Sequence, residues 1–426
     1  MGLVLLILLG TSVAHANIGM ENLGYGAAIV GMGGTGVASG EDTTVINTNP
    51  AAIVRVSNSR TDLGMEIMLP DFGLRNAVND SDGENTGFFI PSASFAIRSS
   101  KRWVFGVGMF NEGGTGTEYG KLQVDNTLLG GSGLASIEHR SSFGLMILAP
   151  ALAYQVTKTL AIGISPQIGY GTFEMEMPWA QPDLQRFGAS DLEGKDFTFR
   201  WKIGALWQPA DWLGFGLAYT TSADLDLRGD IRIKTVTGDI EGMPPLSFLR
   251  GDAEMNIGWP ESYKAGVSLD FRSRGWPLLA LEVQRVKWSR YFDSVSVHFT
   301  NQTLNGILQP DQSFAMAIGM EDQTTYRVGI EIPASDRLAV RLGYTYGRNP
   351  IPAAGLLPVI NAIVEHHITF GLGYRLTENF ILNASTVWGL KNTVRTSTPH
   401  AVSPDAADTA VDMGFFSGSV QGSYVW

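Results

Sequence analysis

The chain has 426 residues, no cysteine and a formal net charge of -11. These values exclude a disulfide framework and a thiolate metal site, and the acidic balance argues against nucleic-acid binding. Hydropathy is near neutral at +0.05, and beyond the N-terminus no run of about 18 apolar residues occurs, so a bundle of transmembrane helices is excluded.

Residues 1–16 have the pattern of a secretory signal peptide. An apolar core from Leu3 to Leu9 precedes Ala14-His15-Ala16, a small-x-small cleavage site before Asn17. A buried core helix is the alternative, but the apolar segment is short and ends at the cleavage pattern. No Lys or Arg precedes the apolar core, as a signal peptide normally requires, so translation from a start codon upstream of Met1 stays an alternative. We expect export.

Residues 17–57 are crowded with glycine and end in a segment that contains Asn49-Pro50-Ala51. Glycine permits close backbone packing and positive φ angles, which suits a compact plug better than a long helix or a regular strand. The run Gly31 to Gly36 formally matches a dinucleotide fingerprint. No hydrophobic strand precedes it, so the match carries little weight.

From Arg60 onward, alternating segments are separated by two kinds of connection that themselves alternate along the chain. Such alternation of short turns and long loops is typical of outer-membrane barrels, and the thirteen connections predict fourteen strands. The short turns are at 99–102, 157–159, 209–211, 272–275, 333–336 and 377–379, and the long connections are near 70–87, 113–141, 175–195, 229–256, 299–321, 350–363 and 396–412.

Within these segments apolar and polar residues alternate with period 2. The final stretch, Phe416 to Trp426, places Val420, Tyr424 and Trp426 on one face and small polar residues on the other. This pattern suits a wall with lipid on one side and a wet lumen on the other. A soluble sandwich or a propeller is the alternative, but the segments are long. Aromatic residues near strand ends suit interfacial girdles: Trp103, Trp212, Trp276, Trp288 and Trp388.

Several stretches resemble the FadL family of outer-membrane long-chain fatty acid and hydrocarbon transporters. The stretches that carry the resemblance are Asn22 to Ala28, Gly31 to Ala38, Asn49-Pro50-Ala51, Tyr263 to Phe271, Val286 to Ser289, Arg341 to Tyr346 and Ile368 to Tyr374. The resemblance implies an all-β membrane protein: a signal peptide (1–16), an N-terminal hatch (17–57) and a 14-stranded antiparallel barrel (58–426) that the hatch plugs.

The resemblance also implies lateral diffusion, in which the ligand leaves through an opening in the barrel wall. The resemblance places that opening at an inward kink of the third strand, beside Asn49-Pro50-Ala51. The third strand is Trp103 to Phe110, and we place the gate at Gly106 and Gly108, because glycine weakens strand pairing and permits a kink. Relief of crowding in a curved wall is the alternative role for either glycine.

Two long connections carry apolar residues that are unusual for loops facing water, and flexible methionine suits varied lipids. Packing of these residues against one another, to hold the loops shut, is the alternative. The predicted outer ligand groove consists of Met175, Met177, Trp179, Leu184, Phe187, Met243, Leu246, Phe248 and Leu249.

A ligand carboxylate needs a cation, and inward-facing positions offer Arg98, Arg200, Lys202, Arg327, Arg341 and Arg375. Of these, we predict Arg200, Lys202 and Arg341 as the contacts of a ligand carboxylate. Most of the six are expected to pair with inward acids instead, such as Asp270, Glu282, Glu331 and Glu365. For an uncharged hydrocarbon no cation is needed.

Catalysis has little support in the sequence. His366 and His367 are adjacent and point to opposite faces of a strand, so they cannot chelate one metal together. Common hydrolase and metalloprotease motifs are absent. We expect no enzyme, no metal and no cofactor, although a barrel phospholipase stays an alternative.

The predicted function is passive uptake of hydrophobic compounds, with long-chain fatty acids as the first ligand class, across the bacterial outer membrane. An uptake channel for aromatic or aliphatic hydrocarbons is the main alternative, and a general porin is another. The expected partners are hydrophobic small molecules, detergents and outer-membrane lipid. The protein is expected to be a monomer.

Overall fold

The computed structural model describes residues 18–56, 58–84, 87–125, 134–181, 186–236, 246–396 and 408–426. The predicted signal peptide lies outside the described residues. The strands are β1 (Arg60–Arg75), β2 (Asp80–Asp82), β3 (Phe88–Arg98), β4 (Trp103–Asp125), β5 (Leu134–Gln155), β6 (Leu160–Gln181), β7 (Arg186–Ala210), β8 (Leu213–Thr220), β9 (Ala223–Val236), β10 (Leu246–Trp259), β11 (Ser262–Asp270), β12 (Leu278–Val286), β13 (Ser294–Leu304), β14 (Ile307–Leu308), β15 (Gln312–Ala317), β16 (Gln323–Pro333), β17 (Leu338–Gly347), β18 (His366–Arg375), β19 (Phe380–Arg395) and β20 (Ala410–Val425). The short helices are α2 (Ala27–Gly31), η1 (Thr43–Asn47), η2 (Pro50–Arg55), η5 (Arg272–Arg274), α3 (Ser289–Phe292) and η6 (Ala353–Gly355).

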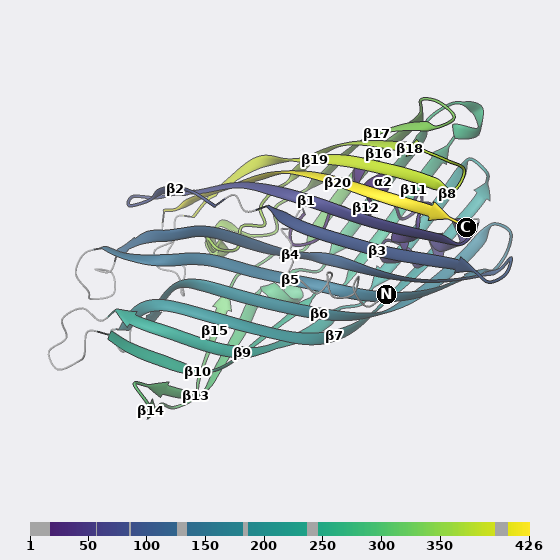
Figure 1. The fold of residues 1–426 in the computed structure, drawn as a ribbon. Coiled ribbons are helices and arrows are strands. Elements are labelled where there is room, and N and C mark those ends of the chain that lie inside the picture. The colour runs from purple at the N-terminus through teal and green to yellow at the C-terminus, as the bar shows by residue number, and fades with distance from the viewer. Residues whose placement is uncertain are drawn as a thin grey trace.

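The strands form one antiparallel ring, which Figure 1 shows as a tilted barrel. Four wall strands are interrupted and carry two labels each, namely β8 with β9, β11 with β10, β12 with β13 and β16 with β15. Counted in this way, the ring is a 14-stranded antiparallel barrel, as predicted.

The first and last strands close the ring. β1 pairs with β20 from Arg60↔Val425 to Arg75↔Ala410, and the backbone N–H of Trp426 donates to the carbonyl of Ser59 at 2.9 Å. Val420, Tyr424 and Trp426 are each more than half exposed on the outer face. The predicted orientation of the final strand is confirmed.

Alternation along the strands separates an apolar outer face from a buried inner face. In β7, for example, Phe197 and Phe199 are 70% and 51% exposed, whereas the intervening Thr198 is buried. Four of the five tryptophans predicted for the girdles are exposed. Trp288 is not: the prediction for it was wrong, because the chain leaves β12 for α3 at this point and turns the indole into the lumen.

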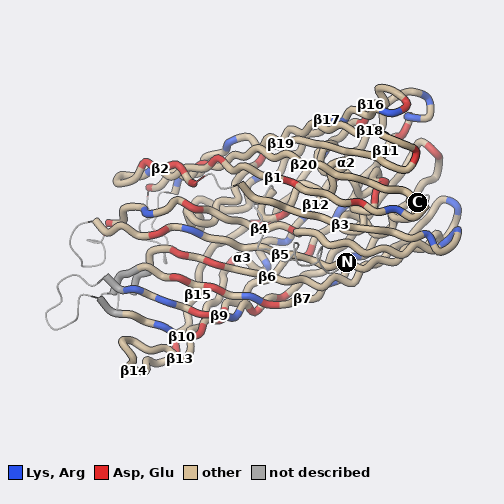
Figure 2. Tube along the Cα trace, in the orientation of Figure 1, with Lys and Arg blue, Asp and Glu red and all other residues tan. Residues whose placement is uncertain are grey.

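The short turns lie at one end of the barrel, called here the turn end, and the other end is the extended end. The predicted long connections were too long, because paired strands continue into them. The expected loop 113–141, for instance, is mostly β4 and β5, which pair as far as Asp125↔Leu134. Lys, Arg, Asp and Glu concentrate along these extensions and around the turn end (Figure 2).

Residues 18–56 lie inside the ring, as predicted for the hatch (Figure 1). α2 packs against β18 and β19, η1 against β3 and β4, and η2 against β5, β6 and β7. Nearly every hatch residue is buried. None of the helices among the described residues is long and apolar enough to cross a membrane.

Candidate functional site

The Asn49-Pro50-Ala51 segment fixes the hatch against the wall. The Asn49 amide donates to the carbonyls of Val37 at 2.7 Å and Ala205 at 3.0 Å. Opposite it, Gly163 of β6 and Gly204 of β7 have no room for a Cβ, because one would overlap the hatch. These glycines therefore let the hatch backbone approach the wall closely.

A buried charged network ties the hatch to β4 and β7. Nη2 of Arg200 lies 2.6 Å from Oε1 of Glu112, and Glu112 also accepts hydrogen bonds from Tyr25 at 2.9 Å and Asn47 at 2.6 Å. Lys202 donates to the carbonyl of Asn47 at 2.6 Å. Both predicted carboxylate contacts on β7 are therefore occupied by groups of the protein itself.

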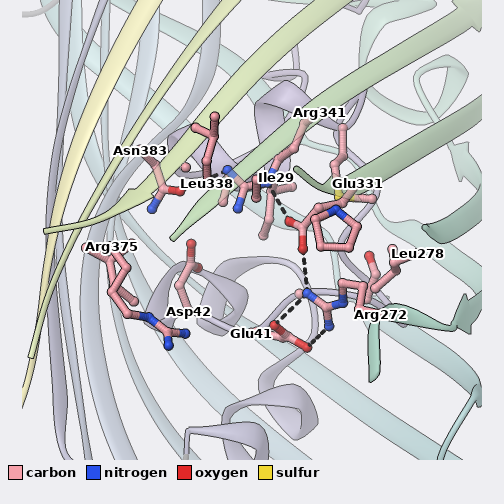
Figure 3. Close-up of a pocket in the computed structure, with 18 of the residues that line it drawn as sticks. Ile29, Glu41, Asp42, Arg272, Leu278, Glu331, Leu338, Arg341, Arg375 and Asn383 are labelled. Carbon is pink, nitrogen blue, oxygen red and sulfur yellow. Dashed lines mark hydrogen bonds and ion pairs between the residues drawn. The ribbon is translucent and has the colours of Figure 1, made fainter. Parts of the chain in front are cut away.

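Arg341 is also engaged. It donates to Glu331 at 2.6 Å and to Asn383 at 2.9 Å, beside a cavity of about 220 Å³ at the turn end. Figure 3 shows Glu331 between Arg341 and Arg272, with Arg272 reaching on to Glu41. The chain of ion pairs links the hatch to the wall.

The remaining predicted cations have varied surroundings. Arg327 pairs with Glu282 at 3.1 Å, as expected, and Arg98 donates to the carbonyl of Val56 at 2.9 Å. Arg375 points into the cavity of Figure 3.

The hatch also bonds to the strands that close the ring. Gln421 of β20 donates to Asp42 and to Asp62, each at 3.0 Å, and Arg60 forms an ion pair with Asp62 at 2.9 Å. Burial raises the pKa of the Asp42 carboxyl, and the charge of Asp62 raises it further. This polar cluster joins the hatch, β1 and β20 at one place.

β4 leaves the wall partway along its length. Its pairing with β3 ends at Ala93↔Met109, although β3 continues to pair with β1 on its other side. Among the described residues, Phe89–Ser92 have no partner on β4. Beyond Met109, β4 bulges at Gly113 and forms a bridge with Glu21 of the hatch instead. We call the opening between Phe89–Ser92 and β4 the wall gap.

Backbone bonds to the hatch hold the displaced part of β4. The backbone N–H of Gly114 donates to the carbonyl of Met20 at 2.8 Å, and the backbone N–H of Asn22 donates to the backbone carbonyl of Glu112 at 3.3 Å. The Asn22 amide also donates to the carbonyl of Asn111 at 2.7 Å. The hatch therefore replaces β3 as the neighbour of β4 over this stretch.

The wall gap has a limit toward the extended end as well. Past β3, the segment around β2 returns to β4: Glu84 donates to the carbonyl of Glu118 at 2.7 Å, and Asn79 exchanges two bonds of 2.8 Å with Gln123. The wall gap is therefore a window with paired chain at both ends.

The lumen between the hatch and the extended end is apolar. Hatch residues Ile18, Met20 and Leu23 belong to the same buried cluster as side chains from most of the surrounding strands. Next to the hatch the cluster is aromatic, with ring centroids 5.8–6.4 Å apart from neighbour to neighbour. Its rings are Phe143, Phe173, Trp259, Trp288 and Phe292.

A connection from the extended end folds into this lumen. Residues 348–365, between β17 and β18, bury Ile351, Leu357 and Val359 in the cluster. The carbonyl of Val359 accepts hydrogen bonds from Thr117 of β4, at 2.9 Å, and from Ser141 of β5. The segment, which we call the inner loop, thus reaches β4 and β5 and covers the apolar cluster. We call the part of the lumen that this cluster fills the apolar chamber.

The structure spreads the predicted groove residues over different environments. Met175, Met177 and Leu249 are buried in the luminal cluster, whereas Phe248 faces outward and is 46% exposed. Trp179, Phe187 and Leu246 contribute backbone to β6, β7 and β10, and Leu184 and Met243 lie outside the described residues.

The predicted gate glycines lie just before the departure of β4. Gly106 pairs with Ala96 and Gly108 with Ser94, so both belong to the regular part of the wall. The Asn49-Pro50-Ala51 segment packs on β5, β6 and β7, whereas the backbone of Met20, Glu21 and Asn22 contacts the backbone of the displaced part of β4. Sequence reasoning missed these residues and Asn111 and Glu112. The adjacent glycines Gly113 and Gly114 are the sequence feature that could have indicated a bulge of β4 at this point.

A plugged antiparallel barrel with an apolar belt and a gap in its wall defines an outer-membrane transport protein. The short turns then mark the periplasmic end and the extended strands the external end. The family model described as outer membrane protein transport protein (OMPP1/FadL/TodX) matches residues 10–415. The chain belongs to this family, whose members are channels and not enzymes.

Solved structures of similar fold include several hydrocarbon channels. The Pseudomonas putida toluene transporter TodX is 20% identical, with 95% of this chain and 99% of that chain covered and a TM-score of 0.77. The Ralstonia pickettii toluene transporter TbuX is also 20% identical over 95% and 99%, with a TM-score of 0.74. A Pseudomonas aeruginosa FadL homologue is 14% identical over 96% and 99%, with a TM-score of 0.75.

One curated relative also matches, over a short stretch. An uncharacterized protein from the 5′ region of the phosphoenolpyruvate carboxykinase gene of Chlorobium limicola is 36% identical over 83 residues. The match covers 20% of this chain and 37% of that relative's length.

Proposed function

We propose that the protein is a passive channel that takes up uncharged hydrophobic molecules, aromatic hydrocarbons first, and releases them sideways into the outer membrane through the wall gap. The observation that carries the proposal is the departure of β4 from β3 after Met109. A strand edge without its neighbour leaves an opening in the hydrocarbon region that a closed barrel avoids. Pro91 lies in the stretch of β3 that pairs with β1 but has no partner on β4, and proline is tolerated at such a strand edge.

The residues that fill the lumen support lateral exit of the ligand through the wall over passage along the barrel axis. The hatch occupies the barrel near the turn end, and the buried cluster beyond it is apolar. A molecule that travels by displacing apolar contacts is matched to this chamber, because each buried CH₂ group contributes about 0.8 kcal/mol. A general porin needs a water-filled lumen, which this arrangement disfavours.

Charge supports an uncharged ligand over a fatty acid. Arg200, Lys202 and Arg341, the cations selected for a carboxylate, all contact groups of the protein itself. The residues that line the cavity beside the wall gap include the acid Glu66 and no Lys or Arg. Two of the similar structures are described as toluene transporters, which points the same way. Long-chain fatty acids stay the second candidate, supported by the family description.

Uptake by cells that lack other channels of this family tests the proposal. Protein-dependent entry of toluene should exceed that of oleate. Entry of oleate without any effect on toluene would favour the fatty-acid candidate. A steady ion conductance of the purified protein in planar bilayers would favour a porin.

The exit route can be tested separately with cysteine pairs, because the chain has no native cysteine. Ser92 and Phe110 are the next pair that the β3–β4 register would bring together after Ala93↔Met109. Oxidation of a Ser92→Cys/Phe110→Cys variant should close the foot of the wall gap and reduce toluene entry, and a reductant should restore it. The control pair Ser296→Cys/Ala315→Cys joins β13 to β15, away from the wall gap, and should leave entry unchanged. Equal entry with oxidised and reduced Ser92/Phe110 pairs would place the exit elsewhere.

A further inference from the structure

A small cavity lies at the foot of the wall gap, between the hatch and the inner face of the wall. Its volume is about 30 Å³, and its lining comes from the hatch, β1, β3, β4 and β20. A cavity needs roughly 10–15 Å³ to admit a water-sized group, so this one takes a group of one or two heavy atoms. We call it the notch.

Three polar side chains that line the notch have buried atoms without a hydrogen-bond partner among the described residues. They are Oδ1 and Nδ2 of Asn111, Oδ1 of Asn22 and Oε1 of Glu66. Asn111 is 2% exposed and Asn22 is 7% exposed. Buried polar atoms are nearly always paired, so four such atoms around one small cavity point to a ligand group that completes them.

The fold explains why these atoms have no internal partner. The hatch bonds to the backbone carbonyl of Asn111 and not to its amide, because β4 has turned away from β3 at this residue. A regular strand pair at this position would have brought a β3 side chain over the Asn111 amide. The departure of β4 therefore creates both the wall gap and the notch.

The chemistry of the notch fits a neutral hydroxyl group. A hydroxyl donates one hydrogen bond and accepts others. Here its proton can go to Glu66 or to the Asn22 oxygen, and its oxygen can accept from the Asn111 amide. A ligand carboxylate would be buried there with no cation among the lining residues, which disfavours it. The neighbouring walls of the notch are apolar and aromatic: Tyr25 and Phe110, which also lie side by side with ring centroids 5.5 Å apart, and Val30 and Ile90.

We propose that the notch is a polar subsite for the hydroxyl group of an uncharged phenol or alcohol, whose hydrocarbon part occupies the wall gap during exit. The subsite rests on the proposed lateral passage, and it extends the ligand class from plain hydrocarbons to their neutral hydroxylated derivatives. The notch is too small for a ring, so it contacts the polar end alone.

Three ligands that differ in one substituent test the subsite: toluene, p-cresol and p-toluate. Protein-dependent entry of each is measured for the wild type and for Asn111→Leu, which keeps the branched shape of the side chain and removes both polar atoms. We expect Asn111→Leu to lower the ratio of p-cresol entry to toluene entry roughly three- to tenfold, the effect of one net hydrogen bond. Glu66→Gln should increase p-toluate entry several-fold and leave toluene entry unchanged.

Asn256→Leu is the matched control, because Asn256 bonds to Asp226 on the external part of the wall, away from the notch. It should leave all ratios at the wild-type value. Protein-dependent toluene entry with an unchanged p-cresol ratio in Asn111→Leu and an unchanged p-toluate entry in Glu66→Gln would overturn the subsite and leave the proposed function standing. Toluene entry that does not depend on the protein would overturn the proposed function.

Equilibrium binding tests the subsite without transport. Calorimetry of the detergent-solubilised protein should show tighter binding of p-cresol than of toluene for the wild type and for Asn256→Leu. Asn111→Leu should remove that difference. Equal affinities for the two ligands in the wild type would overturn the subsite, whatever the uptake assays show. Heat-modifiable mobility in gels shows that each variant forms the barrel.

Discussion

Oε1 of Glu112 lies 2.6 Å from Nη2 of Arg200, and both side chains are almost fully buried inside the barrel. Glu112 belongs to the displaced part of β4 and Arg200 to β7, so the pair spans the space that the hatch fills. Asn47 and Tyr25 of the hatch bond to the same carboxylate. One acid therefore holds the kinked strand β4, the hatch and β7 together.

Glu112→Gln should loosen the hatch without preventing barrel formation. Removing one partner of a buried ion pair leaves the other charge uncompensated and costs about 3–5 kcal/mol. We expect a lower temperature of unfolding, faster proteolysis within residues 18–56, and ion conductance in planar bilayers where the wild type shows none. Glu254→Gln is the control, because its pair with Arg228 is exposed and contributes at most about 1 kcal/mol. Wild-type proteolysis and conductance in Glu112→Gln would contradict this role.

Gly113→Val should reduce toluene entry, because the bulge of β4 depends on this glycine. Its φ is +149°, and a Cβ would overlap the carbonyl of Met20. A side chain in such a conformation costs on the order of 1–3 kcal/mol and pushes β4 off the hatch. Gly418→Val in β20 is the matched control, since a Cβ there meets no atom within 4 Å. Equal entry in the two variants, with normal heat-modifiable mobility, would show that the bulge does not shape the route.

A disulfide between the inner loop and β5 should block entry from outside. Ser141 bonds to the carbonyl of Val359, so a Ser141→Cys/Val359→Cys variant can fix the inner loop over the apolar chamber. Because the inner loop covers the chamber, a ligand can enter only if the loop moves. Toluene entry should fall after oxidation and recover with a reductant. In the two single-cysteine variants, toluene entry should change with neither treatment. Undiminished entry in the oxidised form would mean that ligands reach the chamber by another path.

Asn49→Ala should destabilise the hatch at its contact with β6 and β7. The substitution removes the cap of η2, worth roughly 0.5–2 kcal/mol, and the bonds to Val37 and Ala205. Proteolysis within the hatch should accelerate, with a smaller effect than in Glu112→Gln because no buried charge is left unpaired. Asn305→Ala, near the tip of β13, provides a control remote from the hatch. If the hatch of Asn49→Ala resists proteolysis as well as that of the wild type, the other contacts are sufficient to hold the hatch in place.

The barrel could be predicted because alternation is a local property of the sequence. The pairing of β1 with β20 follows once Arg60 to Leu69 and Phe416 to Trp426 are recognised as first and last strands. The strand extensions could not be predicted, since beyond the membrane both faces of a strand meet water or protein and the alternation fades. β4 shows this: it runs 23 residues, well past Phe110, where its alternating pattern ends.

The site was harder to predict, because its parts depend on partners far apart in the sequence. Asn111 and Glu112 look like loop residues until β4 is seen to bond to Met20 and Asn22. Trp288 looks like a girdle residue until the chain turns inward at α3. The cations on β7 attract attention as ligand contacts, but their protein partners lie on the hatch and on β4, which no local pattern reveals.

The junction of the hatch with the closing strands makes retention of the hatch and closure of the ring depend on the same side chains. The hatch precedes β1 in the chain, yet Asp42 bonds to Gln421 in the last strand, and Asp62 of β1 bonds to the same amide. Once β20 docks on β1, the ring is complete and a bulky segment can no longer thread in from the side. The N-terminal segment is therefore enclosed by the closed ring, and its polar edge forms part of the seam between the first and last strands.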